Sequence, residues 1–309
     1  MPPTPRSIVA ALLAGALLGA PAVAPAVAAA APAPAPAPPA APDASARATA
    51  PSAATMDALM RATRLGTQSR DAAEAVAGAV IEGFEAEARA APPGTIEAVR
   101  EIATAAFSPD RFEDVVAARL AGTLSEEDAR RVAERATSPL WQRALDGEEA
   151  HDLDADPEGF MRFVEGFGRG PDDAERLAAT GEILEAAGGA ELIGSIVIDV
   201  RKAMVRGAAL ADPYAGPAQV DAALDTIEAG RAATVAQLGE LLPMVLAWSY
   251  EDLSIKEVHA LAAEARRPER RRFNAAASEA VRDALVLGSL EFADRASRAT
   301  EALRKTSRI

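Results

Sequence analysis

Hydrophobic positions recur at helical spacing along the chain from Met56 onward. Side chains three and four residues apart share one face of a helix, so these stripes predict helices that each bury one face. The most apolar stripe runs from Leu192 to Met204, and Asp199, Arg201 and Lys202 interrupt it. Charged side chains are unfavourable inside a bilayer, so this stripe predicts a core helix rather than a membrane span. No run of alternating β-branched and aromatic residues predicts a strand, and the expected fold class is all-α.

Two segments of the chain resemble each other at a constant offset. They are Leu124 to Trp141, LSEEDARRVAERATSPLW, and Leu253 to Arg270, LSIKEVHALAAEARRPER. Pro139 of the first segment aligns with Pro268 of the second without a gap. Proline cannot continue a helix and is pre-organised for the first helical turn, so each segment predicts a helix, a tight turn and a second helix.

The two segments also share a helix-capping pattern. Ser125 stands three residues before Asp128, and Ser254 stands three residues before Glu257. A serine hydroxyl at such a position accepts a hydrogen bond from the first helical turn, and the carboxylate can reach back to the amide of the serine. Both positions therefore predict helix N-termini.

These patterns predict a tandem helical repeat, in which each capped helix-turn-helix unit has flanking helices. The first repeat is expected over residues 55–155 and the second over residues 172–309. Residues 156–171 connect them, and the glycines from Gly166 to Gly170 favour a hinge in that connection.

The N-terminus predicts export. Residues 1–28 combine one early arginine, an apolar run from Ile8 to Ala20 and small residues that fit a cleavage site after Ala28, as in a signal peptide. An uncleaved anchor is the alternative, although Pro21 and Pro25 would interrupt its helix. Residues 29–54 form an Ala/Pro-rich segment that predicts a disordered linker. The expected localisation is periplasmic or secreted, with no transmembrane segment after cleavage.

Composition narrows the classes of partner. The formal net charge is −14 and the chain has no cysteine. An acidic protein repels phosphate backbones, which argues against nucleic acid as a partner. The absence of cysteine excludes disulfides, thiol catalysis and thiolate metal sites.

The LS-x-x-[DE] … P pattern, together with a signal segment and helical flanks, resembles a secreted bacterial all-helical family known only as a domain of unknown function. In that family an aromatic pair often precedes the proline, whereas this chain has Arg135-Ala136 and Glu264-Ala265 there. The resemblance implies a periplasmic helical domain and supplies no catalytic residues.

Few residues predict chemistry. His151 and His259 are far apart, no H-E-x-x-H or G-x-S-x-G motif is present, and each histidine is interpreted as a surface or cap residue. The acidic run from Asp152 to Asp156 lacks the glycine and glutamate of a calcium loop, so Asp156 is interpreted as the cap of a helix that starts at Pro157. We therefore expect no catalytic, cofactor-binding or metal-binding residues.

Five arginines cluster near the second proline: Arg266, Arg267, Arg270, Arg271 and Arg272. Such a cluster predicts a face that docks on an anionic envelope component or an acidic protein, and the alternative is pairing with the carboxylates of the same chain. Trp248 and Tyr250 precede the second capped turn, where aromatic side chains either pack helices together or contact a ligand.

Two functions remain open from the sequence. The first is a non-catalytic interaction or accessory module that binds an envelope protein or an anionic envelope component. The second is a small-molecule or lipid-binding helical module with an apolar cleft between the repeats. An enzyme is the third and least favoured class, because no convergent set of nucleophile, base and metal ligands is visible.

Overall fold

The computed structural model describes residues 49–87, 94–153, 155–211 and 216–306, and over these residues it contains helices and no strand. The all-α prediction is confirmed. The helices are α2 (Ala53–Ala62), α3 (Leu65–Glu87), α4 (Thr95–Ala106), α5 (Pro109–Thr123), α6 (Glu126–Ala136), α7 (Pro139–Ala150), α8 (Pro157–Gly166), α9 (Asp173–Ala186), α10 (Gly189–Ala211), α11 (Pro217–Ala229), α12 (Arg231–Ser249), α13 (Ile255–Ala265) and α14 (Pro268–Thr306).

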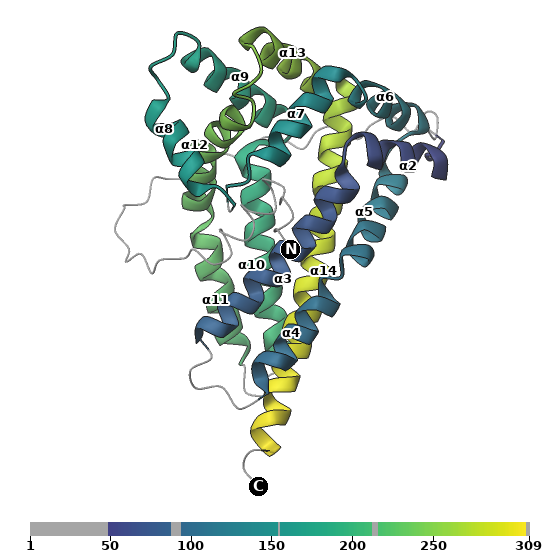
Figure 1. Ribbon diagram of the computed structural model, residues 1–309. Helices are drawn as coiled ribbons and strands as arrows, with labels where there is room; N and C mark the ends of the chain where they lie inside the picture. The colour runs from purple at the N-terminus through teal and green to yellow at the C-terminus, as the bar shows by residue number, and fades with distance from the viewer. Residues whose placement is uncertain (1–48, 88–93, 154, 212–215, 307–309) are drawn as a thin grey trace, which may run out of the picture.

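The helices form two levels (Figure 1). The short helices α6, α7, α8, α9 and α13 gather at one end, and the long helices α3, α10, α12 and α14 run away from them. α14 has 39 residues and passes through both levels to the C-terminus. It packs along α10 and also against α4, α5 and α6, so it is the element that joins the early and late parts of the chain.

The predicted helix starts are confirmed at both related segments. The Ser125 hydroxyl accepts a hydrogen bond from the Asp128 amide at 3.0 Å, and Ser254 forms a full capping box with Glu257. The Asp128 carboxylate has a different partner, because it accepts two hydrogen bonds from Arg272 of α14 at 2.6 and 2.9 Å. α7 and α14 start at their prolines as expected, but α7 has 12 residues against the 39 of α14.

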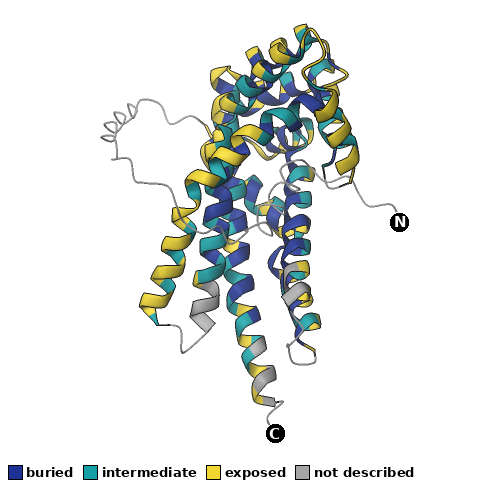
Figure 2. Cartoon of the chain, turned by 90° about the vertical axis from the view of Figure 1, so that its left-hand side faces the viewer, coloured by how far each residue is buried: buried dark blue, intermediate teal, exposed yellow. Residues whose placement is uncertain are grey.

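The main core crosses the boundary between the predicted repeats. Its buried side chains come from α2 to α6 and also from α10 and α14, with Phe107, Leu285 and Phe292 among the largest. A second cluster joins α7, α9 and α13 around Trp141 and Tyr250. Figure 2 shows the buried positions concentrated where the two levels meet and along the long helices, while α11 contributes no buried residue. α6 of the first related segment therefore packs in the main core, whereas α13 of the second segment packs in the second cluster.

Two boundaries differ from those expected. α2 begins at Ala53 with Ser52 as its cap, so helix replaces the last residues of the expected 29–54 linker. α8 occupies most of the expected connection 156–171, and the Asp156 side chain caps it by accepting a hydrogen bond from the Gly159 amide at 2.8 Å, as the sequence indicated.

The expected signal segment, and the linker up to residue 48, lie outside the described residues. Within the described ranges, no helix combines the length and the apolar character needed to cross a bilayer.

Candidate functional site

A cavity of about 290 Å³ lies between α14 and α3 on one side and α7, α9, α10 and α12 on the other. Most of its wall is apolar. α9, α10 and α12 supply most of its large aliphatic side chains, which are Ile183, Leu184, Leu192, Ile193, Ile196, Leu242 and Leu246, and Leu65, Leu145 and Val281 add to them from α3, α7 and α14. The first half of the Leu192–Met204 stripe therefore lines the cavity, while Val197 and Val200 are buried in the main core.

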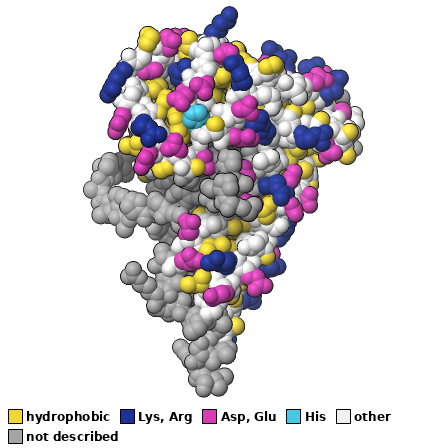
Figure 3. Space-filling model, in the orientation of Figure 1, with side chains coloured by type: hydrophobic (Ala, Val, Ile, Leu, Met, Phe, Trp, Pro, Cys, Tyr) yellow, Lys and Arg dark blue, Asp and Glu magenta, His cyan; other side chains and the backbone are white. Residues whose placement is uncertain are grey.

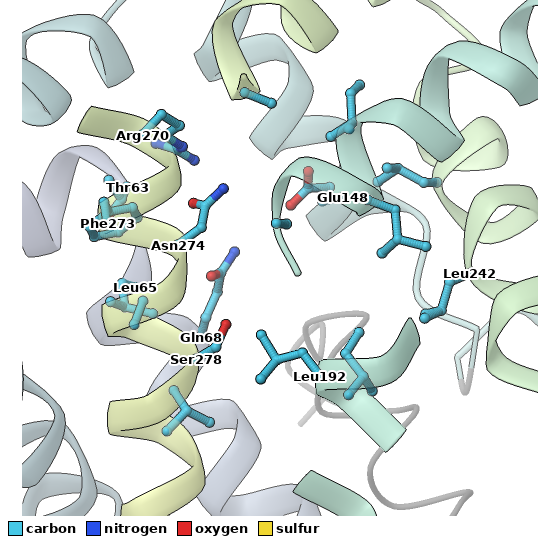
Figure 4. Close-up of a pocket in the computed structure, with 18 of the residues that line it drawn as sticks. Thr63, Leu65, Gln68, Glu148, Leu192, Leu242, Arg270, Phe273, Asn274 and Ser278 are labelled. Carbon is cyan, nitrogen blue, oxygen red and sulfur yellow. The ribbon is translucent and has the colours of Figure 1, made fainter. Parts of the chain in front are cut away.

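The opposite wall carries polar side chains at helical spacing. Arg270, Asn274 and Ser278 follow one another by four residues along α14, and Gln68 and Ser69 stand beside them on α3. Residues four apart lie on the same face of a helix, which explains why one face of α14 presents all three. Figure 4 shows Arg270, Asn274 and Gln68 extending from this wall toward the side that holds Glu148. The cavity is thus amphipathic: its lining is mostly apolar, and most of its polar side chains lie on α14 and α3.

Arg270 is the cation of the cavity. Its guanidinium carbon lies 4.3 Å from the centre of the Trp141 ring and 5.1 Å from the centre of the Phe273 ring. Its Nε is buried and has no hydrogen-bond partner in the part of the chain that the structure describes, and burial lowers the pKa of the guanidinium to about 10. The side chain keeps some accessible surface because it lines the cavity. The guanidinium stays charged at neutral pH. Arg270 is therefore a largely buried cation that borders the mostly apolar cavity.

Glu148 and Tyr250 form a hydrogen-bonded pair at the same cavity. The Tyr250 hydroxyl donates to Glu148 Oε1 at 2.5 Å. Burial raises the pKa of Glu148, and the Tyr250 hydrogen bond and the charge of Arg270 oppose that rise. Burial and the neighbouring carboxyl also raise the pKa of Tyr250 well above its ordinary value, which keeps the phenol protonated as the donor.

A second acidic position lies on α3 outside the cavity. Asp71 is half-buried, and burial raises its pKa from 3.8 to about 6. The charges of Glu74, Glu149 and Asp152 add to the rise, and Arg70 opposes it. Because the raised pKa belongs to the folded state, the contribution of Asp71 to stability is fully present below pH 3.8 and is lost as the pH rises through about 6.

Replacing Asp71 with asparagine is therefore expected to raise the free energy of unfolding by about 1 kcal/mol at pH 7.5. The pKa shift alone would correspond to a larger change in the free energy of unfolding, but solvent screening reduces that change at a half-buried position. Urea unfolding at pH 7.5 and pH 3.5 measures the effect, which should disappear at the lower pH. The matched control is Asp57→Asn at an exposed aspartate of α2. An equal gain from both substitutions at pH 7.5 would contradict the explanation.

The five clustered arginines do not share one environment. Arg270 lines the cavity, whereas Arg266 binds Glu182 at 2.5 Å, Arg267 binds Glu264, and Arg272 binds Asp128. Arg271 is exposed. Figure 3 shows Lys and Arg side chains interspersed with Asp and Glu over the visible face. Three of the five thus pair with carboxylates of the same chain, which was the alternative to a docking face.

The two aromatic candidates separate as well. Tyr250 lines the cavity, while Trp248 packs against Phe160 at 5.4 Å and edge-on against His151 at 4.8 Å between ring centres. His151 also contacts the Gly147 carbonyl, and His259 binds Glu175 at the surface. Among the described residues, no group of three or more His, Asp or Glu is arranged to hold a metal ion.

Sequence reasoning missed Glu148 and the polar face of α14, and it predicted that Arg270 belongs to a docking surface. The spacing of Arg270, Asn274 and Ser278 was a usable signal, because Phe273, Ala277 and Val281 alternate with them on the inward side. Polar residues on a buried helix face point to a polar cavity wall or to a buried network.

Comparisons with protein-family models, with curated proteins and with solved structures found no match to this chain, so the resemblance to a secreted helical family stays a prediction.

Proposed function

We propose that the protein is a non-catalytic binding module that holds a small, largely apolar molecule with one polar end in the cavity between α14 and α10. The observation that supports this most is the cavity of about 290 Å³ with aliphatic side chains on one wall and the unpartnered Arg270 on the other. Ligand sites are typically apolar concavities with a few placed polar groups that orient the ligand.

The composition of the walls favours a ligand over a packing defect. Protein interiors are close-packed, and an empty apolar space weakens the fold by an amount that grows with its volume. A ligand that fills the space recovers those contacts. Arg270 adds to the argument, because it lines the cavity without an ion pair to the described residues, and buried charges in folded proteins are usually paired.

The envelope-docking hypothesis has less support. Arg266, Arg267 and Arg272 already pair with carboxylates of this chain, and Arg270 faces the cavity. Paired surface charges offer little net attraction to an anionic partner. Periplasmic or secreted localisation remains part of the proposal, and it rests on the N-terminal sequence alone.

Binding of octanol, a neutral probe, tests the function. Calorimetric titration of the full chain is expected to show one site with a Kd on the order of 100 µM. Ser278→Phe should abolish this binding, because Ser278 lines the cavity and a phenyl ring would occupy the space.

The matched control is Ala275→Phe, at an exposed position of the same helix. This variant should bind octanol as the natural protein does. Absence of saturable binding to the natural protein, or equal loss in both variants, would refute the proposed function. Intact mass of the protein recovered from the periplasm tests export, with a chain that begins near Ala29 as the expected result.

A further inference from the structure

We propose that the molecule bound in the cavity is a small monocarboxylate, with its carboxylate on Arg270 and its apolar body against α9, α10 and α12. This inference rests on the proposed function and specifies the chemistry of the ligand. Two independent features support it: the hydrogen-bonding capacity that remains at the polar wall, and the size of the apolar space.

The polar wall offers hydrogen-bond donors that need an acceptor. The guanidinium of Arg270 lies close to the rings of Trp141 and Phe273. Among the described residues it forms no ion pair, and its side chain lines the cavity. A planar carboxylate matches the fork of a guanidinium with two parallel hydrogen bonds. The amides of Asn274 and Gln68 project from the same wall and add uncharged donors (Figure 4).

Glu148 does not reverse this preference. Its Oε1 already accepts from Tyr250 at 2.5 Å, so the acceptor side of the cavity is partly satisfied, whereas Arg270 is not. A cationic ligand would have to bind beside Arg270 and would be repelled by it. An anionic ligand places its charge beside Arg270, the one cation among the described residues that line the cavity, and Glu148 can accept a proton to reduce repulsion, since burial raises its pKa.

The volume limits the apolar body. The cavity of about 290 Å³ corresponds to about ten times the volume that one water molecule takes up in the liquid. A carboxylate with a chain or ring of about ten non-hydrogen atoms in total fits this space. A single cation also suits a monoanion better than a phosphate, which carries nearly two charges at neutral pH.

Titration of the natural protein with octanoate, octanol and octylammonium tests the inference. Octanoate is expected to bind at least tenfold more tightly than octanol, because a charge-assisted hydrogen bond to a buried group adds to the same apolar contacts. Octylammonium should bind more weakly than octanol. Arg270→Met should remove the preference for octanoate, measured as the ratio of the octanoate and octanol affinities of the same variant.

Three further variants separate charge from folding. Arg270→Lys keeps the charge and should retain part of the octanoate preference, while Arg271→Met removes an exposed arginine one position away and should change nothing. Glu148→Gln keeps an acceptor for Tyr250, removes a negative charge and should leave octanoate binding equal or tighter.

The two proposals fail in different ways. Equal affinity for octanoate and octanol, or tighter binding of octylammonium, would overturn the carboxylate inference and leave the binding function standing. No saturable binding of any of the three probes would overturn both.

Discussion

Replacing Phe107 with alanine is expected to lower the free energy of unfolding by about 4 kcal/mol. Phe107 is 1% exposed and belongs to the main core, with its ring 6.3 Å from that of Phe292. The neighbouring position on α14 is Gly288, where an added Cβ would lie 2.8 Å from the Phe107 ring. Because Gly288 has no side chain to move inward, the space left by the phenyl ring stays empty. Chemical denaturation with an unchanged m-value measures the loss.

A double-mutant cycle makes this explanation specific. Gly288→Ala alone should destabilise the protein, because the new methyl group meets the ring. In the Phe107→Ala background the same substitution should destabilise the protein less, since the contact with the ring is gone, only the Ala106 carbonyl oxygen at 3.1 Å remains close, and alanine favours the helix. The control is Leu287→Ala at a position that is 48% exposed, which should change stability by less than about 0.5 kcal/mol. Additive effects of the first two substitutions would contradict the packing explanation.

Replacing Gly147 with alanine is expected to lower the free energy of unfolding by about 3 kcal/mol and to weaken octanol binding. An added Cβ at Gly147 would lie 2.2 Å from the backbone oxygen of Ser249. Backbone cannot rotate aside as a side chain can, so α7 must move away from the end of α12. Glu148 follows Gly147 directly and Tyr250 follows Ser249, so the movement separates the donor and the acceptor of their hydrogen bond.

The matched control is Gly181→Ala in the middle of α9, where an added Cβ meets nothing within 4 Å. It is expected to stabilise the protein by up to about 1 kcal/mol through helix propensity. Thermal unfolding and octanol titration of both variants give the comparison. If Gly147→Ala behaved like Gly181→Ala, the close approach of α7 to α12 would not hold in solution.

Local signals made the helices predictable. The serine caps at Ser125 and Ser254 and the prolines at 139 and 268 act within one helical turn, so their effect can be deduced from neighbouring residues. The packing of α14 could not be deduced in this way. Its contacts with α4, α5 and α6 join residues far apart in the sequence, and the residues after each proline gave no sign that α14 would be three times as long as α7.

The candidate site was predictable only in part, because its residues also come together through contacts between helices far apart in the sequence. Tyr250 was singled out as an aromatic residue beside a turn, and it both packs in the second buried cluster and lines the cavity. Arg270 belongs to an arginine cluster in the sequence, and only the direction of the α14 face separates it from exposed Arg271. Glu148 carried no signal of its own, because its burial comes from α12 and α14, which follow it in the chain.

The position of α14 also has a consequence for synthesis. Helices α2 to α6 bury their apolar faces in a core that includes α10 and α14, and α14 begins only at Pro268. During translation the N-terminal half therefore has no complete core to fold around until the last helix leaves the ribosome. Until then the nascent chain exposes apolar helix faces, which makes it prone to aggregation. Folding of the main core is thus expected to begin only after α14 has been translated.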